Sequence, residues 1–514
     1  MKTLFYIEAI TNLILVVLYH LHMFQLNSYF YEKHFNWMKN NKSKIIKQVV
    51  LPVITLILVI FNNKACLILA DVVMLALIIC NIPKEKSKIP LKYTARVKRM
   101  LITEFIIVLV ILLVGRRNFA ITLSILNALA FALCLISNLI NKPIEIGIKN
   151  YYINDAKKIL KSMPNLTVIG VTGSYGKTSV KNYLGKMLSQ KYEVLITPKN
   201  YNTTMGVVKT IRENLRPTHQ IFVCEMGATH VGDIKEICDI VNPTIGIITA
   251  VGPQHLESFK SIDNILNTKF ELADSVENNN GVMFLNYSNE LIASKQFNGK
   301  KFTYGIDNKK LDCNAYNIKV NETGLTFTIN TDINEKSEND FETNLLGEHN
   351  VINLAGAIAC SNYLGIPLKK LVPKVREIKS VKHRLELVSH GRINIIDDAY
   401  NSNPVSSKYA INALSKFNDG IRVLVTPGLI ELGSEQDKFN YELGKFAKDK
   451  VDYIYIVGNT NSKSIIDGAV DSGFDKSKIK FANGPQEAVA SASQLDMNKP
   501  ITILLENDLP DNYQ

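Results

Sequence analysis

One stretch constrains the fold of this chain more than any other: residues 170–178, with the sequence GVTGSYGKT. The apolar run at 166–169 before it predicts a buried strand, and residues 179–188 after it carry apolar side chains at helical spacing. A strand, a glycine-rich turn and a helix start together cradle phosphates. The glycines let backbone N–H groups approach the oxygens, and the helix dipole adds positive potential. The segment therefore predicts a phosphate-binding P-loop.

The P-loop pattern gives chemistry to two side chains. Lys177 would reach the outer phosphates of a nucleotide, and Thr178 would offer its hydroxyl to Mg²⁺. The pattern departs from G-x-x-x-x-G-K-[ST], because Val171 stands in place of the first glycine and Gly170 comes one residue earlier. An ordinary strand–turn–helix can produce such a variant, but the nucleotide chemistry further along the chain favours ATP binding.

The positive charge of the chain is concentrated in its N-terminal third. The chain of 514 residues has a formal net charge of +12. Residues 1–150 hold 18 Lys and Arg against 6 Asp and Glu, whereas the remaining 364 residues hold 41 of each. A protein that binds nucleic acid would need a basic face on its folded domains. We therefore expect no nucleic-acid partner.

The same N-terminal third is strongly apolar. Five apolar segments lie near residues 4–25, 46–62, 64–82, 100–115 and 118–140. Each approaches the roughly 20 residues that span a hydrocarbon core, although the fourth is short. The first lacks a signal-peptide cleavage pattern and is followed by further spans. The alternative is a buried helical soluble domain, which the long Val-Leu-Ile runs disfavour, so we predict about five transmembrane helices and contact with membrane lipids.

Basic loops predict the orientation of these helices. The segments Lys33 to Lys47 and Lys84 to Arg99 are strongly positive and should face the cytoplasm. Five spans then place the N-terminus outside and everything after Lys142 in the cytoplasm, where ATP is available. Glu8, Asp71 and Glu104 lie within or at the ends of apolar segments. Pairing with a neighbouring helix or snorkelling to an interface explains them better than function does, so we assign them no role. The seven cysteines show no C-x-x-C spacing and are interpreted as reduced thiols.

The rest of the chain alternates strand-like and helix-like patterns. After a short helix at 151–163, we expect strands at 166–169, 220–224, 244–249 and 281–285, then a small antiparallel insert over 307–344 with a solvated loop at 332–340. A second alternation of strand-like and helix-like patterns follows, with strands expected at 393–396, 423–425, 453–457 and 501–505. We predict a membrane domain (1–150), a central P-loop α/β domain with a parallel sheet (151–380) and a Rossmann-like C-terminal α/β domain (381–514).

Three further side chains fit phosphate chemistry. Glu225 ends a predicted buried strand, where a carboxylate can hold Mg²⁺. His255 follows the next strand, and Lys269 comes fourteen residues later. Taken singly, each has a plainer explanation: Glu225 as a capping residue, His255 as a loop histidine and Lys269 as a solvated helix residue.

Taken together, these motifs resemble the Mur ligases, ATP-dependent amide-forming enzymes of peptidoglycan precursor synthesis. The order is the P-loop, E-M-G-A at 225–228, H-L-E-x-F at 255–259 and Lys269. Asn202 to Val207 resembles the asparagine-rich loop after the P-loop helix, and Gly347 to Asn350 with Asn353 resembles the nucleoside-contacting helix. The sequence DDAYNSNP at 397–404 is similar to the motif of the branch that adds D-alanyl-D-alanine, known as MurF.

The resemblance implies a role for each matching residue. Thr178 and Glu225 would ligate one Mg²⁺, and His255 with a carbamylated Lys269 would ligate a second. Lys177, His255, Lys269, Asp398 and Asn401 would carry the chemistry. The ATP-contacting residues would be Thr172, Gly173, Ser174, Tyr175, Gly176, Lys177, Thr178, Ser179, His349, Asn350, Asn353 and Arg384.

The family's reaction has two steps. A substrate carboxylate attacks the γ-phosphate to give an acyl phosphate, and the amine of an amino acid or dipeptide then displaces phosphate. Closure of the C-terminal domain would place the amine and exclude water. The chain departs from the family in two places: membrane helices occupy the position of the domain that binds the uridine diphosphate sugar, and the C-terminal stretch LLENDLPD at 504–511 differs from an expected Lys/Gly/Ser-containing end.

The sequence leaves several functions open. The first is a membrane-anchored ligase acting on a peptide- or glycopeptide-type carboxylate, UDP-linked or lipid-linked, with D-alanyl-D-alanine or a similar amine. The second is a ligase for a surface polymer outside peptidoglycan. A non-catalytic ATP-binding scaffold for wall synthesis is the third, and retention of Lys177, Glu225, His255 and Lys269 argues against it. An ATP-driven transporter is disfavoured because the chain shows no transporter signature.

Overall fold

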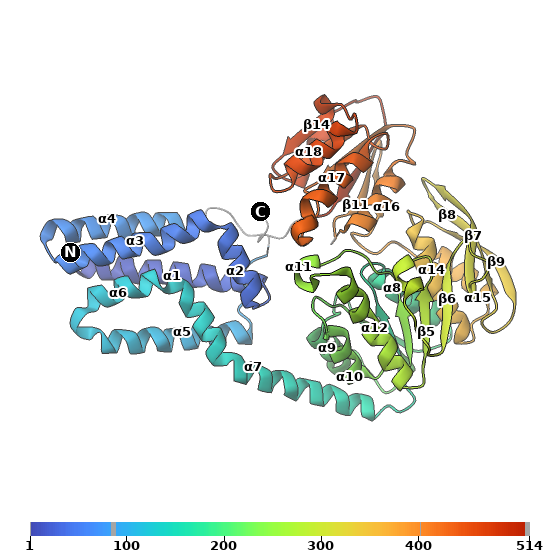
Figure 1. The fold of residues 1–514 in the computed structure, drawn as a ribbon, viewed down its shortest axis with the longest axis horizontal. Helices are drawn as coiled ribbons and strands as arrows, with labels where there is room; N and C mark the ends of the chain where they lie inside the picture. Colours follow the sequence, from blue (N-terminus) through green and yellow to red (C-terminus); the bar gives the residue numbers. More distant parts are fainter. Residues whose placement is uncertain (1, 84–88, 401, 509–514) are drawn as a thin grey trace. The chain divides into compact units, whose positions relative to one another are not determined.

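The computed structural model describes residues 2–83, 89–400 and 402–508. These residues form two compact units, 2–151 and 152–508. The first unit is helical, and the second contains two β-sheets with helices on their faces (Figure 1).

The helical unit is built from long apolar helices joined by short turns. Its helices are α1 (Lys2–Leu26), α2 (Tyr31–Asn40), α3 (Lys42–Phe61), α4 (Lys64–Asn81), α5 (Ala95–Val114), α6 (Phe119–Ala128) and α7 (Ala130–Lys161). The predicted segment at 118–140 is divided between α6 and α7. The separate helix predicted at 151–163 is wrong, because α7 runs through residue 150 without a break and ends at Lys161.

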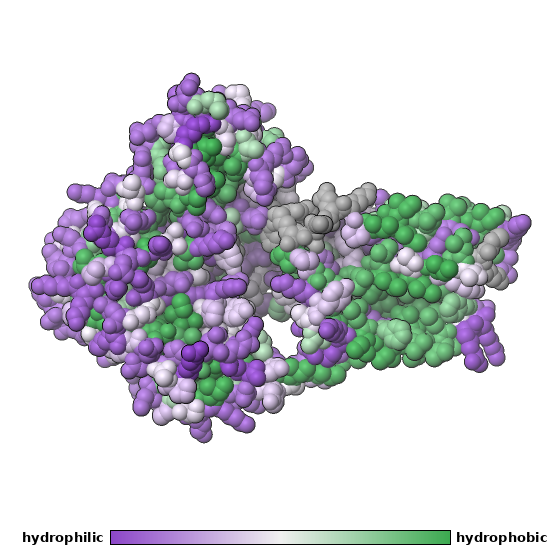
Figure 2. Space-filling view, turned by 180° about the vertical axis from the view of Figure 1, so that it is seen from behind, coloured by the Kyte–Doolittle hydropathy of each residue, from purple (hydrophilic) through white to green (hydrophobic). Residues whose placement is uncertain are grey.

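Within residues 2–83, 89–400 and 402–508, four helices have the length and composition to cross a membrane, one fewer than the predicted five: Thr3–Leu26, Lys42–Phe61, Lys64–Asn81 and Ala130–Lys161. Helix α5 is long enough, but Lys98, Arg99 and Glu104 make it too charged for the same criterion. It nevertheless lies along α7, since Ser137 donates to the buried Glu104 at 2.9 Å and Arg99 pairs with Glu145 at 2.7 Å. Figure 2 shows that apolar side chains dominate the visible surface of this unit.

A chain of buried amide side chains joins the helices of the first unit. The Asn12 amide donates to Asn127 at 2.8 Å and accepts from Asn81 at 2.9 Å. Gln48 donates to Asn81 at 2.9 Å and also contacts the ring of His20 at 3.1 Å. Interhelical hydrogen bonds of this kind fix helix packing where the surroundings offer little apolar driving force.

The first sheet of the second unit has nine strands in the order β2-β3-β1-β4-β5-β6-β7-β8-β9. Neighbouring strands from β2 to β7 in this order pair in parallel. The last two pairings, β7 with β8 and β8 with β9, are antiparallel. The strands are β1 (Thr167–Thr172), β2 (Val194–Ile196), β3 (Ile221–Glu225), β4 (Ile245–Ile248), β5 (Val282–Asn286), β6 (Lys301–Ile306), β7 (Cys313–Asn321), β8 (Gly324–Thr331) and β9 (Ser337–Thr343).

Helices cover both faces of this sheet. One core contains buried side chains from α8 and α14, and a second core contains side chains from α9, α10 and α12. Parallel strands buried on both faces are continuous apolar runs, as β3 and β4 are. The helices are α8 (Lys177–Leu188), α9 (Thr204–Asn214), α10 (Asp233–Val241), α11 (Leu256–Phe259), α12 (Ile262–Asn278), α13 (Glu290–Ser294), α14 (His349–Tyr363) and α15 (Leu368–Arg376).

The antiparallel region differs from its prediction in two ways. The predicted antiparallel pairing is confirmed between β7 and β8 and between β8 and β9, but β7 also pairs in parallel with β6, so these strands extend the main sheet. The predicted loop at 332–340 is too long, because β9 begins at Ser337. Its residues alternate between exposed and buried at its C-terminal end, which polar strand residues at a sheet edge allow.

The second sheet has six strands in the order β10-β11-β15-β12-β13-β14, with only β10 antiparallel among the described strands. They are β10 (Glu386–His390), β11 (Ile393–Asp398), β12 (Ile421–Thr426), β13 (Tyr453–Val457), β14 (Ile479–Ala482) and β15 (Ile501–Glu506). The helices are α16 (Pro404–Leu414), α17 (Gln436–Ala447), α18 (Ser462–Asp471) and α19 (Pro485–Ala492). As predicted, the unit contains two mostly parallel α/β sheets.

Candidate active site

The turn between β1 and α8 requires two of its glycines. Gly173 has φ +152° and Gly176 has φ +84°, values that side chains rarely adopt. A Cβ atom on Gly173 would lie 2.1 Å from Thr249 Oγ1, and one on Gly176 would lie 2.5 Å from Asn353 Oδ1. The glycines therefore let the loop pack against two neighbouring elements while its N–H groups stay at the start of a helix.

Two polar side chains of the P-loop form hydrogen bonds that hold the loop in place. The hydroxyl of Thr172 donates to the carbonyl of Met226 at 2.9 Å, which ties the end of β1 to the end of β3. The Ser174 hydroxyl donates to the carbonyl of Gly252 at 3.0 Å. These predicted ATP contacts therefore also hold the loop against the carboxyl edge of the sheet.

Lys177 is folded back onto the loop that carries it. Its ammonium donates to the carbonyls of Gly173 and Ser174, at 2.6 and 2.9 Å. Burial lowers the pKa of Lys177 to about 8, although the attraction of Glu225 opposes this shift. A phosphate group would offer this ammonium stronger, charge-assisted partners than two carbonyls do.

Glu225 is the centre of a buried polar cluster at the end of β3. It is 1% exposed, and one of its oxygens accepts from Thr178 and from Asn202, both at 3.0 Å. The other lies 2.9 Å from the ammonium of Lys181, which is also 1% exposed. Burial would raise the pKa of Glu225, but Lys181, Lys177 and the Asn202 amide outweigh it and hold the pKa below its usual value. Glu225 therefore stays ionised beside the hydroxyl of Thr178.

The sequence analysis did not identify Lys181. A signal was available, because Lys181 follows Lys177 by four residues and shares its face of α8. Its ammonium also donates to the carbonyl of Lys199 at 2.7 Å, on the asparagine-rich segment. It therefore compensates the charge of Glu225 and anchors the 199–202 segment.

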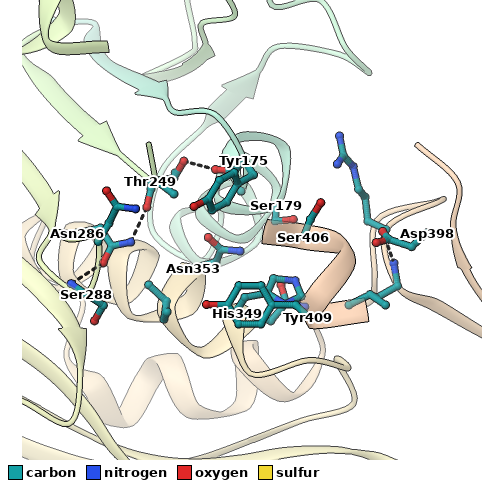
Figure 3. A pocket seen from close by; sticks show the side chains of 17 residues that line it. Tyr175, Ser179, Thr249, Asn286, Ser288, His349, Asn353, Asp398, Ser406 and Tyr409 are labelled. Carbon is teal, nitrogen blue, oxygen red and sulfur yellow. Dashed lines mark hydrogen bonds between the residues drawn. The ribbon is translucent and has the colours of Figure 1, made fainter. Parts of the chain in front are cut away.

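A cleft of about 780 Å³ opens beside the P-loop. Figure 3 shows side chains from the P-loop, β5, α14 and α16 converging on it. The rings of His349 and Tyr409 lie 5.0 Å apart between centroids, and burial lowers the pKa of His349 to about 4, so this imidazole is neutral. The lining residues are Tyr175, Gly176, Ser179, Thr249, Ala250, Asn286, Ser288, Asn289, His349, Asn350, Ile352, Asn353, Arg384, Leu385, Asp398, Ser406 and Tyr409.

The residues predicted to contact the nucleoside all line this cleft, but hydrogen bonds hold some of their side chains more tightly than others. The Asn350 amide is engaged by Tyr183 at 2.7 Å and by the carbonyl of Leu346 at 2.8 Å, so it anchors the start of α14. Neighbouring Asn353 packs over Gly176. Six further lining residues were not predicted, because no motif at these positions points to a nucleoside: Thr249, Asn286, Ser288, Asn289, Ser406 and Tyr409.

A smaller cleft of about 500 Å³ adjoins the first around the P-loop. Arg384 lines both, and its guanidinium carbon lies 4.7 Å from the ring centroid of Tyr400. Asp398 lines the larger cleft and accepts from the N–H of Leu385 at 3.1 Å. Asn401 lies outside the described residues. The smaller cleft is lined by Ser174, Tyr175, Gly176, Lys177, Thr178, Ser179, Asn200, Asn202, Glu225, Gln254, Arg384, Tyr400 and Asn403.

His255 and Lys269 flank the short helix α11. The Nδ1–H of His255 donates to the carboxylate of Glu431, which lies on the loop after β12 and was not predicted. Lys269 is 2% exposed, and its ammonium nitrogen lies 5.8 Å from the ring centroid of Phe259. Burial lowers the pKa of Lys269 to about 7, and the nearby Lys177 adds to this shift. Burial therefore favours the neutral form of this amine.

The predicted metal ligands fit magnesium with help from a substrate. Among the described residues, no three His, Cys, Asp or Glu side chains gather closely enough to hold a metal ion. Thr178 and Glu225 do place a hydroxyl and a carboxylate oxygen 3.0 Å apart in the smaller cleft. Mg²⁺ usually takes one or two carboxylates and completes its shell with phosphates and water. Lys269 fits such a site only as a neutral or carbamylated amine.

Comparisons with known proteins agree with this geometry. Residues 171–361 match the Mur ligase middle domain, and residues 383–506 match the Mur ligase glutamate ligase domain. UDP-N-acetylmuramoyl-tripeptide–D-alanyl-D-alanine ligase of Bacillus subtilis is 30% identical over 315 residues, 61% of this chain and 66% of that enzyme. The Escherichia coli enzyme is 28% identical over 358 residues, 66% of this chain and 77% of that enzyme.

A solved structure extends the agreement to three dimensions. The crystal structure of MurF from Acinetobacter baumannii superposes with a TM-score of 0.62 and 27% identity, covering 70% of this chain and 77% of that chain. This chain spans about two thirds to three quarters of the length of these relatives. With its two matched domains and the P-loop cluster of Lys177, Thr178 and Glu225, this chain belongs to the Mur ligase family of ATP-dependent C–N bond-forming enzymes.

Proposed function

We propose that this protein is a membrane-anchored ATP-dependent ligase that joins an amino acid or dipeptide, such as D-alanyl-D-alanine, to a carboxylate of a cell-wall precursor. One observation carries the proposal. The two clefts share Tyr175, Gly176, Ser179 and Arg384, so the cleft that would hold the nucleoside adjoins the cleft that would hold the phosphates at a single P-loop. The named relatives that add D-alanyl-D-alanine supply the substrate class.

The residues of the smaller cleft have distinct tasks. Lys177 would exchange its two loop carbonyls for the β- and γ-phosphates of ATP. Thr178 and Glu225 would hold Mg²⁺, with Lys181 keeping Glu225 ionised and in place. Bound magnesium would neutralise charge that develops on the transferred phosphoryl group. Arg384, contributed by the C-terminal domain, would cover the nucleotide from the opposite side.

The chemistry would follow the acyl-phosphate route. The acceptor carboxylate attacks the γ-phosphorus, and ADP leaves with the electron pair of the broken P–O bond. The amine then attacks the acyl carbon, and phosphate leaves with the C–O electron pair while the amine loses its proton. Positioning and electrostatic stabilisation supply most of the rate in such transfers.

Lys269 supports a second metal site in its carbamylated form. A neutral amine reacts with carbon dioxide, and the buried Lys269 has the lowered pKa that this requires. The carbamate would give a hard cation an anionic oxygen ligand, and His255 would offer its Nε2 atom. Mass spectrometry of the intact protein prepared with and without bicarbonate tests this modification.

The helical unit would anchor the ligase in the cell membrane. Four helices have the composition of membrane spans, and α5 packs along α7 to supply a fifth pass. The basic segments between helices would face the cytoplasm, which places the N-terminus outside and the ligase domains inside. An anchor would favour a lipid-linked acceptor, because tethering raises the effective concentration of a partner in the same plane.

Phosphate release from ATP by the full chain in nanodiscs tests the proposal. The acceptors are UDP-linked and lipid-linked muramyl tripeptide, each with D-alanyl-D-alanine, and Lys177→Ala is the control. Turnover with the UDP-linked acceptor means an activity like that of the named relatives. Turnover with the lipid-linked acceptor alone explains the membrane anchor.

The absence of turnover with every acceptor would contradict the peptidoglycan proposal. If the chain then still binds ATP, the alternatives are a ligase for another surface polymer or a non-catalytic ATP-binding scaffold. ATP consumption that depends on an added surface glycopolymer would favour the former.

A further inference from the structure

A loop of the C-terminal domain reaches the predicted metal ligand His255. It spans residues 427–432, between β12 and the short helix at Gly433–Glu435, and we call it the β12 loop. Three consecutive residues of the middle domain meet it. The Nδ1–H of His255 donates to the Glu431 carboxylate, Leu256 packs against the core that contains Leu429 and Leu432, and the N–H of Glu257 donates to the Glu431 carbonyl at 3.4 Å.

The β12 loop is held rigidly by its own domain. The buried amide of Asn440 accepts from the N–H of Leu429 at 2.8 Å and donates to its carbonyl at 2.9 Å. Asn461 donates to the Pro427 carbonyl at 3.1 Å, and Asn507 donates to the Gly428 carbonyl at 2.7 Å. Three asparagines from three separate parts of the chain therefore hold the backbone of residues 427–429, which leads to Glu431.

Both partners of the contact have constrained backbones. His255 has φ +53° and Glu431 has φ +61°, in the left-handed region that favours glycine. The carbonyl of His255 accepts from the N–H groups of Ser258 and Phe259, both at 3.0 Å, so the turn into α11 holds the histidine. Unusual backbone conformations in over-determined surroundings gather at functional sites.

We propose that Glu431 is a positioning residue for His255. Its carboxylate takes the Nδ1–H, which fixes the tautomer that presents the Nε2 lone pair to a divalent cation. A histidine that binds a metal commonly donates its other N–H to a carboxylate, and loss of that partner typically lowers metal affinity ten- to hundred-fold. Because Glu431 belongs to the C-terminal domain, the second metal site is complete only when that domain is docked.

This inference rests on the proposed function, since it requires a metal at His255. It adds that metal binding at His255 depends on the C-terminal domain, which the proposed function does not state. The middle domain supplies His255, Lys269, Thr178 and Glu225, but the orientation of the imidazole comes from the other domain. A bound nucleotide spans the same boundary, because Arg384 and Asp398 line its cleft. Nucleotide binding and the second metal site would therefore favour the same docked arrangement.

Manganese binding to the full chain in nanodiscs tests the proposal. Free Mn²⁺ is measured by electron paramagnetic resonance in the presence of a non-hydrolysable ATP analogue. We expect two classes of site in the unmodified protein. Glu431→Ala should weaken one class ten- to hundred-fold and leave the other unchanged, and His255→Ala should affect the same class. Glu431→Gln, whose amide oxygen can still accept from Nδ1–H, should recover most of the loss.

Two controls separate positioning from mere contact between domains. Glu435→Ala removes a solvent-accessible carboxylate four residues further on, which pairs with Lys438 at 2.8 Å, and should leave both Mn²⁺ classes unchanged. Hydrogen exchange of peptides covering 255–259 and 427–433, without metal, reports docking itself. Looser docking in Glu431→Ala with unchanged Mn²⁺ affinity would overturn the proposal, and so would a single Mn²⁺ class in the unmodified protein. Phosphate release judges the ligase function separately.

Discussion

Two buried glutamates end interior strands of the two mostly parallel sheets, but one has a cation beside it and the other has a carboxylate. Glu225 is the last residue of β3 and forms an ion pair with Lys181. Glu506 is the last residue of β15 and is fully buried, but the residue beside it in the sheet register is Asp398. One oxygen of Glu506 accepts from the hydroxyl of Ser402, and the other has no hydrogen-bond partner among the described residues.

The difference shows that the place of a side chain in a sheet does not decide its charge. Lys181 keeps Glu225 ionised, so the middle domain presents a carboxylate suited to a cation. Burial raises the pKa of Asp398 to about 6, and burial with the neighbouring Asp398 raises the pKa of Glu506 well above its usual range. Two adjacent buried carboxylates cannot both ionise readily. Glu506 lies in the C-terminal stretch where the sequence departs from the family pattern.

The largest effect is expected from removing the lysine of the middle-domain pair. Lys181→Met keeps an unbranched side chain in place but removes the ammonium that pairs directly with the buried Glu225. Breaking a buried ion pair in this way costs about 3–5 kcal/mol. Native-state hydrogen exchange of peptides from β1 and β3 should show this loss of local stability.

The matched control is Lys186→Met on the same helix. Lys186 pairs with Glu377 at 2.8 Å, and the two side chains are 45% and 48% exposed. Solvent screens such a pair, so we expect its loss to leave the hydrogen exchange of β1 and β3 nearly unchanged. Equal changes in the two variants would show that Glu225 does not depend on Lys181.

The next largest effect concerns catalysis and leaves stability unchanged. Lys177→Ala removes a cation that contacts only loop carbonyls in the described structure, so its hydrogen-exchange pattern should match that of the unmodified protein. Loss of one preorganised electrostatic group typically lowers kcat about 10²- to 10³-fold. Phosphate release measures this loss. A folded variant with unchanged kcat would remove Lys177 from the mechanism.

The stability that Asp398 and Glu506 contribute should depend on pH in the opposite direction from the stability that Glu225 contributes. A raised pKa means that the folded state holds the proton more tightly than the unfolded chain. The stability that this contributes is complete below the unfolded pKa of about 3.8 and is lost as the pH rises through about 6. Glu225, with its lowered pKa, contributes stability above its unfolded value of about 4.5 and loses it in acid.

Hydrogen exchange at pH 5 and pH 7 tests this difference. The opening free energy of β11 and β15 should fall by about 1–2 kcal/mol between these values, from the linkage of roughly 1.4 kcal/mol per pKa unit. The double variant Asp398→Asn with Glu506→Gln keeps the hydrogen-bonding shape and should remove the fall. A rise in stability of these strands over the same range would contradict the raised pKa values of this pair.

The sequence predicted the middle-domain half of the site better than the C-terminal half, for a physical reason. Lys177, Thr178 and Glu225 belong to short motifs at strand ends, and a parallel sheet brings strand ends to one edge. Glu431 meets His255 only through the docking of two domains, and Glu506 meets Asp398 only through the register of the second sheet, so no local pattern encodes either contact. The long α7 was missed because a helix that leaves an apolar segment needs no sequence signal to continue.

The smallest expected effect, at Asn403, distinguishes a structural role from a catalytic one within the motif at 397–404. Asn403 lines the smaller cleft, but its side chain accepts from the N–H groups of Val405 and Ser406, both at 3.0 Å, as the N-cap of α16. Asn403→Ala should lower the stability of α16 by about 1 kcal/mol, and Asn403→Asp should preserve it, because aspartate caps as well as asparagine. Hydrogen exchange of α16 and phosphate release decide the outcome together. If Asn403→Asp keeps the helix but loses turnover, the residue contacts substrate, and the C-terminal half of the site carries more of the chemistry than its packing reveals.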